Sequence, residues 1–507
     1  MRIEGGVYLG QSIEDEWLEL KLANRHGLVT GATGTGKTVS LQVLAEGLSE
    51  AGVSVFAADI KGDLSGIGAL GQEKDWIVER AKKIGFLEWE PKKFPVVYWD
   101  LFGKQGHPIR ATISEMGPLL LARLMNLNEV QEGVLNIVFK LADQEGLLLL
   151  DLKDLRAVLS HVAERADELT VDYGNVSKAT VGTIQRQLLV LEKQGAEKFF
   201  GEPALAIADL MATDAQGRGR VNVLAADELM ANPRLYATFL LWLMSELFEE
   251  LPEVGDLQKP KLVFFFDEAH LLFDEAPKAL IDKVEQVVRL IRSKGVGVYF
   301  VTQNPLDVPD EVSAQLGNRV QHALRAFTPR EQKAVRAAAE TFRQNPKFKT
   351  ETAITELAVG EALVSMLHGK GVPSVVQRTF VRPPEARVGP LTPTERATLV
   401  NTSPLAGRYD DTIDRLSAYE KLRGKVVGSA GGAAPAPQGG EGASGGGFFD
   451  GILETVGSIA GMKTGGPRSQ TLGEAIVKSA ARSAASAAGR QISNAIVRGV
   501  LGSLFKR

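Results

Sequence analysis

One octapeptide constrains the fold of this chain more than any other segment. It reads Gly31-Ala32-Thr33-Gly34-Thr35-Gly36-Lys37-Thr38 and fits the pattern G-x-x-x-x-G-K-[ST] of phosphate-binding loops. Glycine adopts backbone conformations that strain other residues, so consecutive N–H groups can point at phosphate oxygens. We expect Lys37 to reach the β- and γ-phosphates of a nucleotide and the Thr38 hydroxyl to coordinate Mg²⁺.

The segments on either side of this loop supply the setting that the motif needs. Residues 27–30 form a short apolar run that can be a buried strand. After the loop, apolar side chains recur at helical spacing up to Gly52, and the strand formers of residues 53–58 follow. The order strand, glycine loop, helix, strand therefore predicts a phosphate site at the N-terminus of the helix.

The composition is that of a globular protein with a large core. Apolar residues make up 44% and charged residues 24% of the 507 residues, which is ordinary for such proteins, and the length suggests about two to four domains. The lack of cysteine excludes disulfides and thiolate metal sites. The sequence contains neither a signal-peptide pattern nor an apolar stretch of membrane-spanning length, so we expect a cytoplasmic protein.

Changes in sequence character along the chain predict its organisation. We expect a helical insertion that divides an α/β core of alternating strands and helices. A linker of Gly, Ala, Ser and Pro, which cannot bury enough apolar surface to fold, is expected near the C-terminus. The predicted ranges are 1–25 for an N-terminal β segment, 26–110 and 216–390 for the two parts of the core, 111–215 for the insertion, 391–427 for a helical extension, 428–470 for the linker and 471–507 for a basic amphipathic helix.

Charge is distributed unevenly between the body and the C-terminus. Residues 465–507 carry seven lysines and arginines against one acid, Glu474, which gives this segment a net charge of +6. Because the whole chain has a formal net charge of −4, the remainder carries −10. A basic tail on an acidic body suggests that the tail binds a partner protein, a nucleic acid or an anionic membrane surface.

The apolar run 262–266 ends in two carboxylates, Asp267 and Glu268. The carboxyl ends of strands in an α/β sheet lie at the edge where ligands bind. There we expect Asp267 to hold Mg²⁺ through water, and Glu268 to orient and deprotonate the water that attacks the nucleotide. The alternative is an acidic N-cap after a buried strand, and the phosphate loop favours the catalytic interpretation.

Two more polar residues are expected at the same sheet edge. Gln303 ends the apolar run 297–302 and can contact the γ-phosphate or the attacking water, or simply cap the strand. Asp59 ends the strand that follows the phosphate-loop helix. It is a third candidate carboxylate for the metal or the water, with an ion pair to Lys61 as the equally weighted alternative.

Arginines matter because cleavage of the γ-phosphate builds charge that a guanidinium stabilises, often from a neighbouring subunit. Four arginines lie near the motifs: Arg289, Arg292, Arg319 and Arg325. A solvated helix face is the alternative for any one of them. Residues 267–270 also spell the DEAH of a large helicase class, but the arginine motif of the second lobe of those helicases does not occur. We therefore expect His270 to make local hydrogen bonds.

These motifs together resemble a known superfamily. The phosphate loop, FFFDEAHLLF at 264–273, RLIRSKGVGVYFVTQNPLDVPD at 289–310 and QLGNRVQHALRAFTP at 315–329 are similar to those of the HerA/FtsK superfamily of RecA-like ATPases. Within it they resemble the HerA-like bacterial family of the YjgR type. The resemblance covers roughly residues 1–390, and the basic tail resembles the C-terminus of that family.

The resemblance implies a fold and an activity. The implied fold is α/β, a RecA-like parallel-sheet P-loop NTPase core. The implied activity is hydrolysis of ATP with Mg²⁺ in a homo-oligomer, expected to be a hexameric ring, whose sites lie between subunits. It assigns the Walker A role to Lys37 and Thr38, the Walker B role to Asp267 and Glu268, and the sensor role to Gln303. Arg292 aligns with the region of the superfamily's trans-acting arginine.

Two functions are consistent with these residues. The first is a ring-forming motor, helicase-like, that translocates on double-stranded DNA. The second is an ATPase that acts on protein or on an envelope-associated complex, with the basic tail 471–507 as a partner-binding or peripheral membrane anchor. A GTPase is disfavoured because no N-K-x-D guanine-reading element occurs, and Glu268 points to hydrolysis rather than transfer to a small acceptor.

Overall fold

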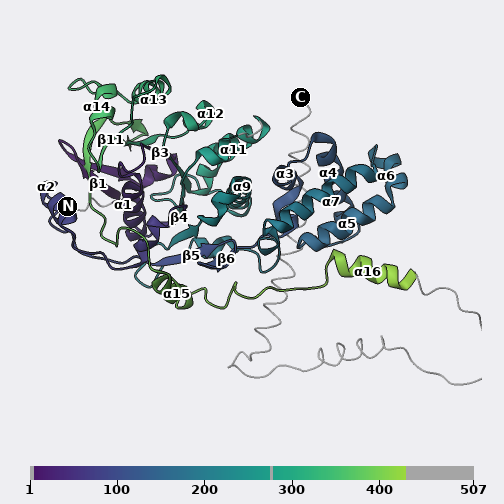
Figure 1. The fold of residues 1–507 in the computed structure, drawn as a ribbon. Coiled ribbons are helices and arrows are strands. Elements are labelled where there is room, and N and C mark those ends of the chain that lie inside the picture. Colours follow the sequence, from purple (N-terminus) through teal and green to yellow (C-terminus); the bar gives the residue numbers. More distant parts are fainter. Residues whose placement is uncertain (1–4, 275–277, 430–507) are drawn as a thin grey trace, which may run out of the picture. The chain divides into compact units, whose positions relative to one another are not determined.

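A large mixed sheet organises the computed structural model, which describes residues 5–274 and 278–429 (Figure 1). Within these residues the sheet has 12 strands. In sheet order they are β2 (Asp15–Glu19), β1 (Gly6–Gln11), β14 (Gln377–Val381), β11 (Glu361–Ser365), β10 (Asn318–Gln321), β3 (Gly27–Thr30), β9 (Val296–Thr302), β8 (Leu262–Phe266), β4 (Ser54–Asp59), β7 (Val221–Ala225), β5 (Val96–Asp100) and β6 (His107–Pro108). A separate hairpin pairs β12 (Leu367–His368) with β13 (Val372–Pro373).

The strands from β10 to β6 run parallel to one another, which confirms the predicted RecA-like sheet. Strands β2, β1, β14 and β11 add an antiparallel extension beside β10. In the order β3-β9-β8-β4, strand β9 lies between the strand before the phosphate loop and the strand before Asp267. The carboxyl ends of all four strands therefore meet at one edge of the sheet.

Helices separate the strands along the chain. The helices of the α/β part are α1 (Lys37–Glu50), α2 (Asp75–Lys83), α9 (Pro233–Glu250), α10 (His270–Phe273), α11 (Lys278–Ile291), α12 (Asp310–Ser313), α13 (Pro329–Glu340), α14 (Thr350–Glu356) and α15 (Pro393–Asn401). Helix α16 (Ala418–Ser429) packs instead against the helical insertion between β6 and β7 (Figure 1). Short 3₁₀ turns are η1 (Leu20–Arg25), η2 (Asp63–Gly68), η3 (Ala196–Lys198), η4 (Glu228–Ala231), η5 (Arg292–Lys294) and η6 (Pro305–Asp307).

Alternating side chains of the central strands feed two separate cores. In β8, Phe264 and Phe266 belong to one apolar cluster, whereas Val263 and Phe265 belong to the other. This alternation is the two-residue period of a strand that is buried on both faces. The first cluster includes side chains of α9 and α11, and the second includes side chains of α1, so helices cover the sheet on both sides.

The segment between β6 and β7 is helical. It contains α3 (Ile113–Leu124), α4 (Glu129–Gln144), α5 (Leu152–Glu164), α6 (Ala166–Tyr173), α7 (Lys178–Lys193) and α8 (Ile207–Leu210). Capping boxes at Thr112, Asn128 and Asp151 start α3, α4 and α5, because each side-chain oxygen accepts a bond from a first-turn N–H that has no partner within the helix. The apolar faces of these helices join the first core cluster.

Other expectations about organisation concern the ends of the chain. Strands β1 and β2 occupy the predicted N-terminal β segment, and α15 and α16 lie within or close to the predicted extension 391–427. The described residues belong to one compact unit. The predicted linker, from residue 430 on, and the whole basic helix 471–507 lie outside the described residues. Within the described ranges, none of the helices combines the length and hydrophobicity that a membrane crossing requires.

Candidate active site

The phosphate loop forms the turn between β3 and α1. Three of its glycines have positive φ, +153° at Gly31, +80° at Gly34 and +115° at Gly36, which favours glycine at these positions. At Gly31 a Cβ would also come within 2.5 Å of the Cβ of His322. The loop therefore needs glycine at this position both for its backbone conformation and for the close approach of a neighbouring strand end.

Lys37 is the first residue of α1, and its ammonium lies inside the loop. Its Nζ donates to the carbonyl oxygens of Gly31 at 2.6 Å and Ala32 at 3.1 Å. Burial lowers the pKa of Lys37, while the carboxylates of Glu268 and Asp267 act in the opposite direction. The lysine thus places a positive charge at the N-terminus of α1, where the helix dipole already favours anions.

Asp267 and Glu268 follow β8 directly. Glu268 has a φ of +48°, a left-handed conformation that is uncommon for residues other than glycine and that concentrates at functional sites. Its backbone N–H donates to Asp267 Oδ1 at 2.9 Å, and the Tyr236 hydroxyl on α9 donates to the Asp267 carbonyl at 2.9 Å. These bonds fix the turn that aims the two carboxylates.

Gln303 joins the two halves of the site. Its Nε2 donates to Glu268 Oε1 at 3.1 Å, and its Oε1 accepts a bond from Thr33 Oγ1 at 3.0 Å. The residue follows β9, which lies between β3 and β8. A single amide therefore spans from the phosphate loop to the carboxylate, which is the position from which a side chain can respond to the γ-phosphate.

Two basic side chains, Lys61 and His270, approach Glu268 from other elements. Lys61, just after β4, has its Nζ 3.5 Å from Glu268 Oε1, and His270 Nδ1 lies 3.5 Å from Glu268 Oε2. The Glu268 side chain itself is 7% exposed. The local role expected of His270 agrees with this placement. The sequence did not indicate that Lys61 faces Glu268, because the contact joins the ends of two strands that are far apart in the chain.

Asp59 lies at the same sheet edge, at the end of β4. Its Oδ2 accepts a bond from the N–H of Leu64 at 3.1 Å. Burial raises the pKa of Asp59 to about 7, and the nearby charge of Asp267 adds to the increase. Lys61, the alternative partner considered for Asp59, is instead directed to Glu268.

His322 packs against the phosphate loop at Gly31, a role that the sequence did not reveal. It follows β10, and its N–H donates to the Thr30 carbonyl at 2.7 Å. The ring lies between Ser40 Oγ, 2.8 Å from Nε2, and the Glu361 carbonyl, 2.9 Å from Nδ1. Since a carbonyl only accepts, Nδ1 carries the proton and Nε2 accepts from Ser40. Burial lowers the pKa of His322 to about 4.

Three of the four candidate arginines contact residues outside the phosphate loop of their own chain, whereas Arg325 follows β10 at the sheet edge where the loop lies. Arg292 lies in η5, just before β9 begins, and its Nη2 is 3.3 Å from Asp256 Oδ1. Gln303 follows the other end of β9, so Arg292 lies at the opposite edge of the sheet. Arg289 pairs with Glu285 at 3.5 Å. Arg319 donates to the Ser313 carbonyl at 3.0 Å, and Arg325 is exposed beyond β10.

The residues present fit Mg²⁺. A hydroxyl from Thr38 in the first turn of α1 and a carboxylate from Asp267 are the hard oxygen ligands that this ion prefers, with water and phosphate oxygens as the others. Burial and the neighbouring Glu268 raise the pKa of Asp267 to about 6, so the site gathers negative charge that a cation would neutralise. Asp59 adds a third carboxylate at the same edge.

Comparison with known proteins identifies the family. The model of the family described as "Helicase HerA-like C-terminal" matches residues 8–507. The chain belongs to this family. Membership, together with the phosphate loop, confirms the predicted class, a P-loop ATPase of the HerA/FtsK type. No significant relative was found among curated proteins.

Solved structures with a similar fold are distant in sequence. The structure of VirB4 of Thermoanaerobacter pseudethanolicus superimposes with a TM-score of 0.50 at 14% identity and covers 75% of this chain and 97% of that one. The plasmid coupling protein TrwB in complex with ADP and Mg²⁺ gives a TM-score of 0.43 at 18% identity, covering 72% of this chain and 88% of that one. The VirB4 likeness supports the assignment of the fold.

Proposed function

We propose that this HerA-like protein hydrolyses ATP with Mg²⁺ and uses the energy to move along double-stranded DNA as a homo-oligomeric, hexameric ring. The observation that carries the proposal is the Thr33–Gln303–Glu268 chain of hydrogen bonds. It connects the phosphate loop to the carboxylate of Glu268, a residue whose backbone has a positive φ. This geometry supports hydrolysis because a base is held beside the place where the γ-phosphate of a bound nucleotide would lie.

Each residue has a distinct task in the proposed reaction. The loop amides and Lys37 hold the phosphates, and Thr38 and Asp267 hold Mg²⁺, which when bound neutralises phosphate charge. Glu268 accepts the proton of the attacking water. Gln303 orients Glu268 and responds to the presence of the γ-phosphate. Asp59 adjusts the negative charge around the Mg²⁺ position.

In the proposed ring, a neighbouring subunit supplies an arginine to each active site. The γ-phosphate gains charge as its bond breaks, and an arginine normally stabilises that charge. Arg292 lies at the edge of the sheet opposite to its own phosphate loop, a placement that supports action on the site of a neighbouring subunit. In a closed ring, head-to-tail contacts repeat this arrangement at every interface.

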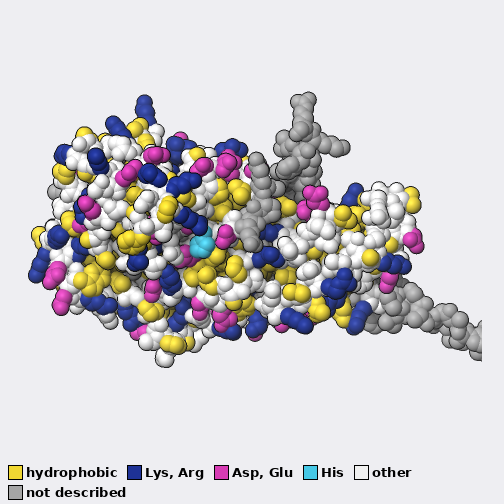
Figure 2. Space-filling view, turned by 45° about the horizontal axis from the view of Figure 1, so that its top comes forward, with side chains coloured by type: hydrophobic (Ala, Val, Ile, Leu, Met, Phe, Trp, Pro, Cys, Tyr) yellow, Lys and Arg dark blue, Asp and Glu magenta, His cyan; other side chains and the backbone are white. Residues whose placement is uncertain are grey.

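Motion along DNA is supported by the family rather than by surface charge. On the face shown in Figure 2, lysine and arginine side chains are interspersed with aspartate and glutamate. A surface of this kind gives little overall attraction for nucleic acid. The proposal therefore requires a locally basic surface, such as the lining of a ring pore.

The test is the ATPase rate of the purified protein with and without double-stranded DNA at low and moderate salt. The proposal predicts stimulation by DNA, and DNA binding that weakens as salt rises because counterions are released on binding. Unchanged hydrolysis, together with no salt-sensitive DNA binding, would contradict the translocase while leaving the ATPase intact.

The charge of the C-terminus favours one alternative. With its net charge of +6, the tail supports an ATPase that acts on a protein or an envelope-associated complex, with residues 471–507 bound to an acidic partner or an anionic membrane surface. Removal of residues 428–507 would then abolish binding to vesicles that contain anionic lipid while ATP hydrolysis persists. Loss of DNA binding in the same truncated protein would favour the first proposal instead.

A further inference from the structure

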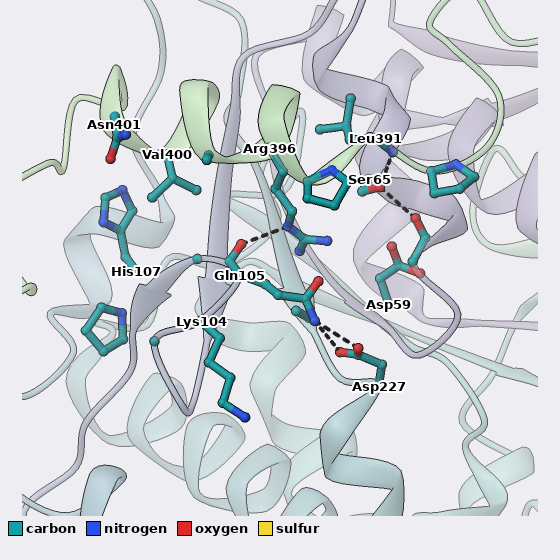
Figure 3. A pocket seen from close by; sticks show the side chains of 18 of the residues that line it. Asp59, Ser65, Lys104, Gln105, His107, Asp227, Leu391, Arg396, Val400 and Asn401 are labelled. Carbon is teal, nitrogen blue, oxygen red and sulfur yellow. Dashed lines mark hydrogen bonds between the residues drawn. The ribbon is translucent and has the colours of Figure 1, made fainter.

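A cavity of about 730 Å³ lies beside the candidate active site at the same edge of the sheet. The ends of β4 and β7 and the loop from β5 to β6 form its floor, and α15 with the segments around it forms its roof (Figure 3). The carboxyl edge of a parallel sheet is where α/β proteins bind ligands, and cavities of about 300–1,000 Å³ hold small organic molecules. The phosphate loop is not part of the cavity lining.

Two buried polar side chains of the lining have unused hydrogen-bonding atoms. Arg396 on α15 is 8% exposed, and its Nη2 has no hydrogen-bond partner among the described residues. Its Nε donates to the Gln105 carbonyl at 2.7 Å, and the guanidinium lies over the ring of Tyr98 at 5.0 Å. Figure 3 shows the guanidinium directed into the space between Gln105 and Asp59.

His107 supplies the second unused atom. It is 1% exposed, its Nδ1 lies 3.4 Å from Asp410 Oδ1, and within the described ranges its Nε2 has no partner. When Nδ1 donates to Asp410, Nε2 is an acceptor, and a ligand hydroxyl can donate to it. Buried polar atoms in folded proteins are nearly always satisfied, so the cavity offers one donor and one acceptor position to an occupant.

The charges of the lining define the class of that occupant. Two acids of the lining already accept hydrogen bonds from the protein. Both carboxylate oxygens of Asp227 accept from Gln105 Nε2, at 2.9 and 2.8 Å, and Asp59 accepts from the N–H of Leu64. The cations can still donate hydrogen bonds. The Nη2 of Arg396 has no partner among the described residues. The Lys61 side chain is 47% exposed, and its contact with Glu268 is a long one of 3.5 Å. A guanidinium and an ammonium together favour an oxyanion.

We propose that this cavity is a second ligand site, which binds a small hydroxylated organic oxyanion through Arg396 and Lys61, with a ligand hydroxyl on His107. A phosphate and a carboxylate satisfy the two cations by the same chemistry. Because Lys61 also faces Glu268, binding at this site and the state of the candidate active site are energetically coupled.

The test is isothermal titration calorimetry on the full chain saturated with Mg²⁺ and a non-hydrolysable ATP analogue, which occupies the phosphate loop and the γ-phosphate position. The probes are ribose 5-phosphate and gluconate, with neutral ribose as the comparison. We expect saturable binding of at least one of the two anions and none of ribose. Binding of ribose 5-phosphate alone assigns a phosphate ligand, and binding of gluconate alone assigns a carboxylate.

Variants decide whether the anion occupies this cavity. We expect Arg396→Gln to weaken binding at least tenfold. Arg396 also holds Gln105, so a second variant leaves it in place: Ala397→Trp places a large side chain in the cavity and should abolish binding. Arg415→Gln, which removes an exposed guanidinium paired with Glu202, should bind like the wild type. Equal binding of ribose, no saturable binding of either anion, or binding unchanged in both Arg396→Gln and Ala397→Trp would overturn the proposal.

Discussion

Gln303 donates a hydrogen bond to Glu268, with 3.1 Å between Nε2 and Oε1, although 35 residues separate them in the chain. The bond exists because β9 and β8 are neighbours in the sheet and both end at the same edge. The other end of the Gln303 amide contacts Thr33 of the phosphate loop. One side chain thereby connects the phosphate loop to the carboxylate, and we propose that it transmits a change at the γ-phosphate position to Glu268.

The first prediction concerns the base. Glu268→Gln should lower the rate of ATP hydrolysis by about 10²–10⁴-fold while nucleotide binding persists, because an amide cannot take the proton from water but retains the size of the side chain. Steady-state turnover and binding of a fluorescent ATP analogue measure the two effects. Glu285→Gln on α11, which alters a carboxylate paired with Arg289, is the matched control. Wild-type turnover in Glu268→Gln would exclude this residue as the base.

Gln303 should act on turnover more than on affinity. Gln303→Leu removes both hydrogen bonds of the amide, to Thr33 and to Glu268. We expect a fall of about tenfold or more in kcat with a smaller change in KM, since the bonds orient the base rather than hold the nucleotide. A rise in KM at unchanged kcat would show that Gln303 contributes only to binding.

Lys37 is predicted to decide nucleotide binding. Lys37→Ala removes the ammonium that lies against the Gly31 and Ala32 carbonyls, and the variant should bind ATP at least about tenfold more weakly, as expected for the loss of a charge-assisted contact to phosphate. Equilibrium binding measures this. Lys104→Ala, at an exposed lysine paired with Glu228, should leave affinity unchanged. Equal affinity in Lys37→Ala and the wild type would contradict the proposed phosphate site.

Arg292 is predicted to act on a neighbouring subunit. Arg292→Ala and Glu268→Gln should each be inactive alone, and mixed rings should regain up to about a quarter of wild-type turnover. In random equimolar rings, about that fraction of interfaces pairs an intact Glu268 with an intact Arg292. Arg289→Ala, one turn earlier, is the control and should hydrolyse ATP normally. Absence of recovery in the mixture would place the function of Arg292 within its own chain or outside catalysis.

His322 should make stability depend on pH. Burial lowers its pKa from 6.5 to about 4, so the folded state keeps the ring neutral while the unfolded chain protonates it. The contribution of His322 to stability is therefore complete above pH 6.5 and is lost as pH falls toward 4, by about 1.4 kcal/mol per pH unit. Between pH 7 and 5 the wild type should lose about 2 kcal/mol more free energy of unfolding than His322→Gln.

Urea denaturation at the two pH values tests this prediction. His26, whose pKa burial also lowers to about 4, is present in both proteins, so its contribution cancels in the comparison. Equal losses in the wild type and His322→Gln would show that the buried ring is not responsible.

The local parts of this protein can be predicted from its sequence. Glycine spacing and the following Lys37 and Thr38 predicted the loop, and the apolar runs that end in Asp267 and Gln303 predicted two buried strands with polar ends, because strand burial and glycine conformation depend on neighbouring residues. The HerA-like family followed from those motifs. How these parts contact one another is seen first in the folded structure. Strand order placed β9 between β3 and β8, brought Lys61 to Glu268 and His322 behind Gly31, and set Arg292 at the far edge. Such contacts depend on which strands pair across hundreds of residues, and pairing is determined by the packing of two cores rather than by any local pattern.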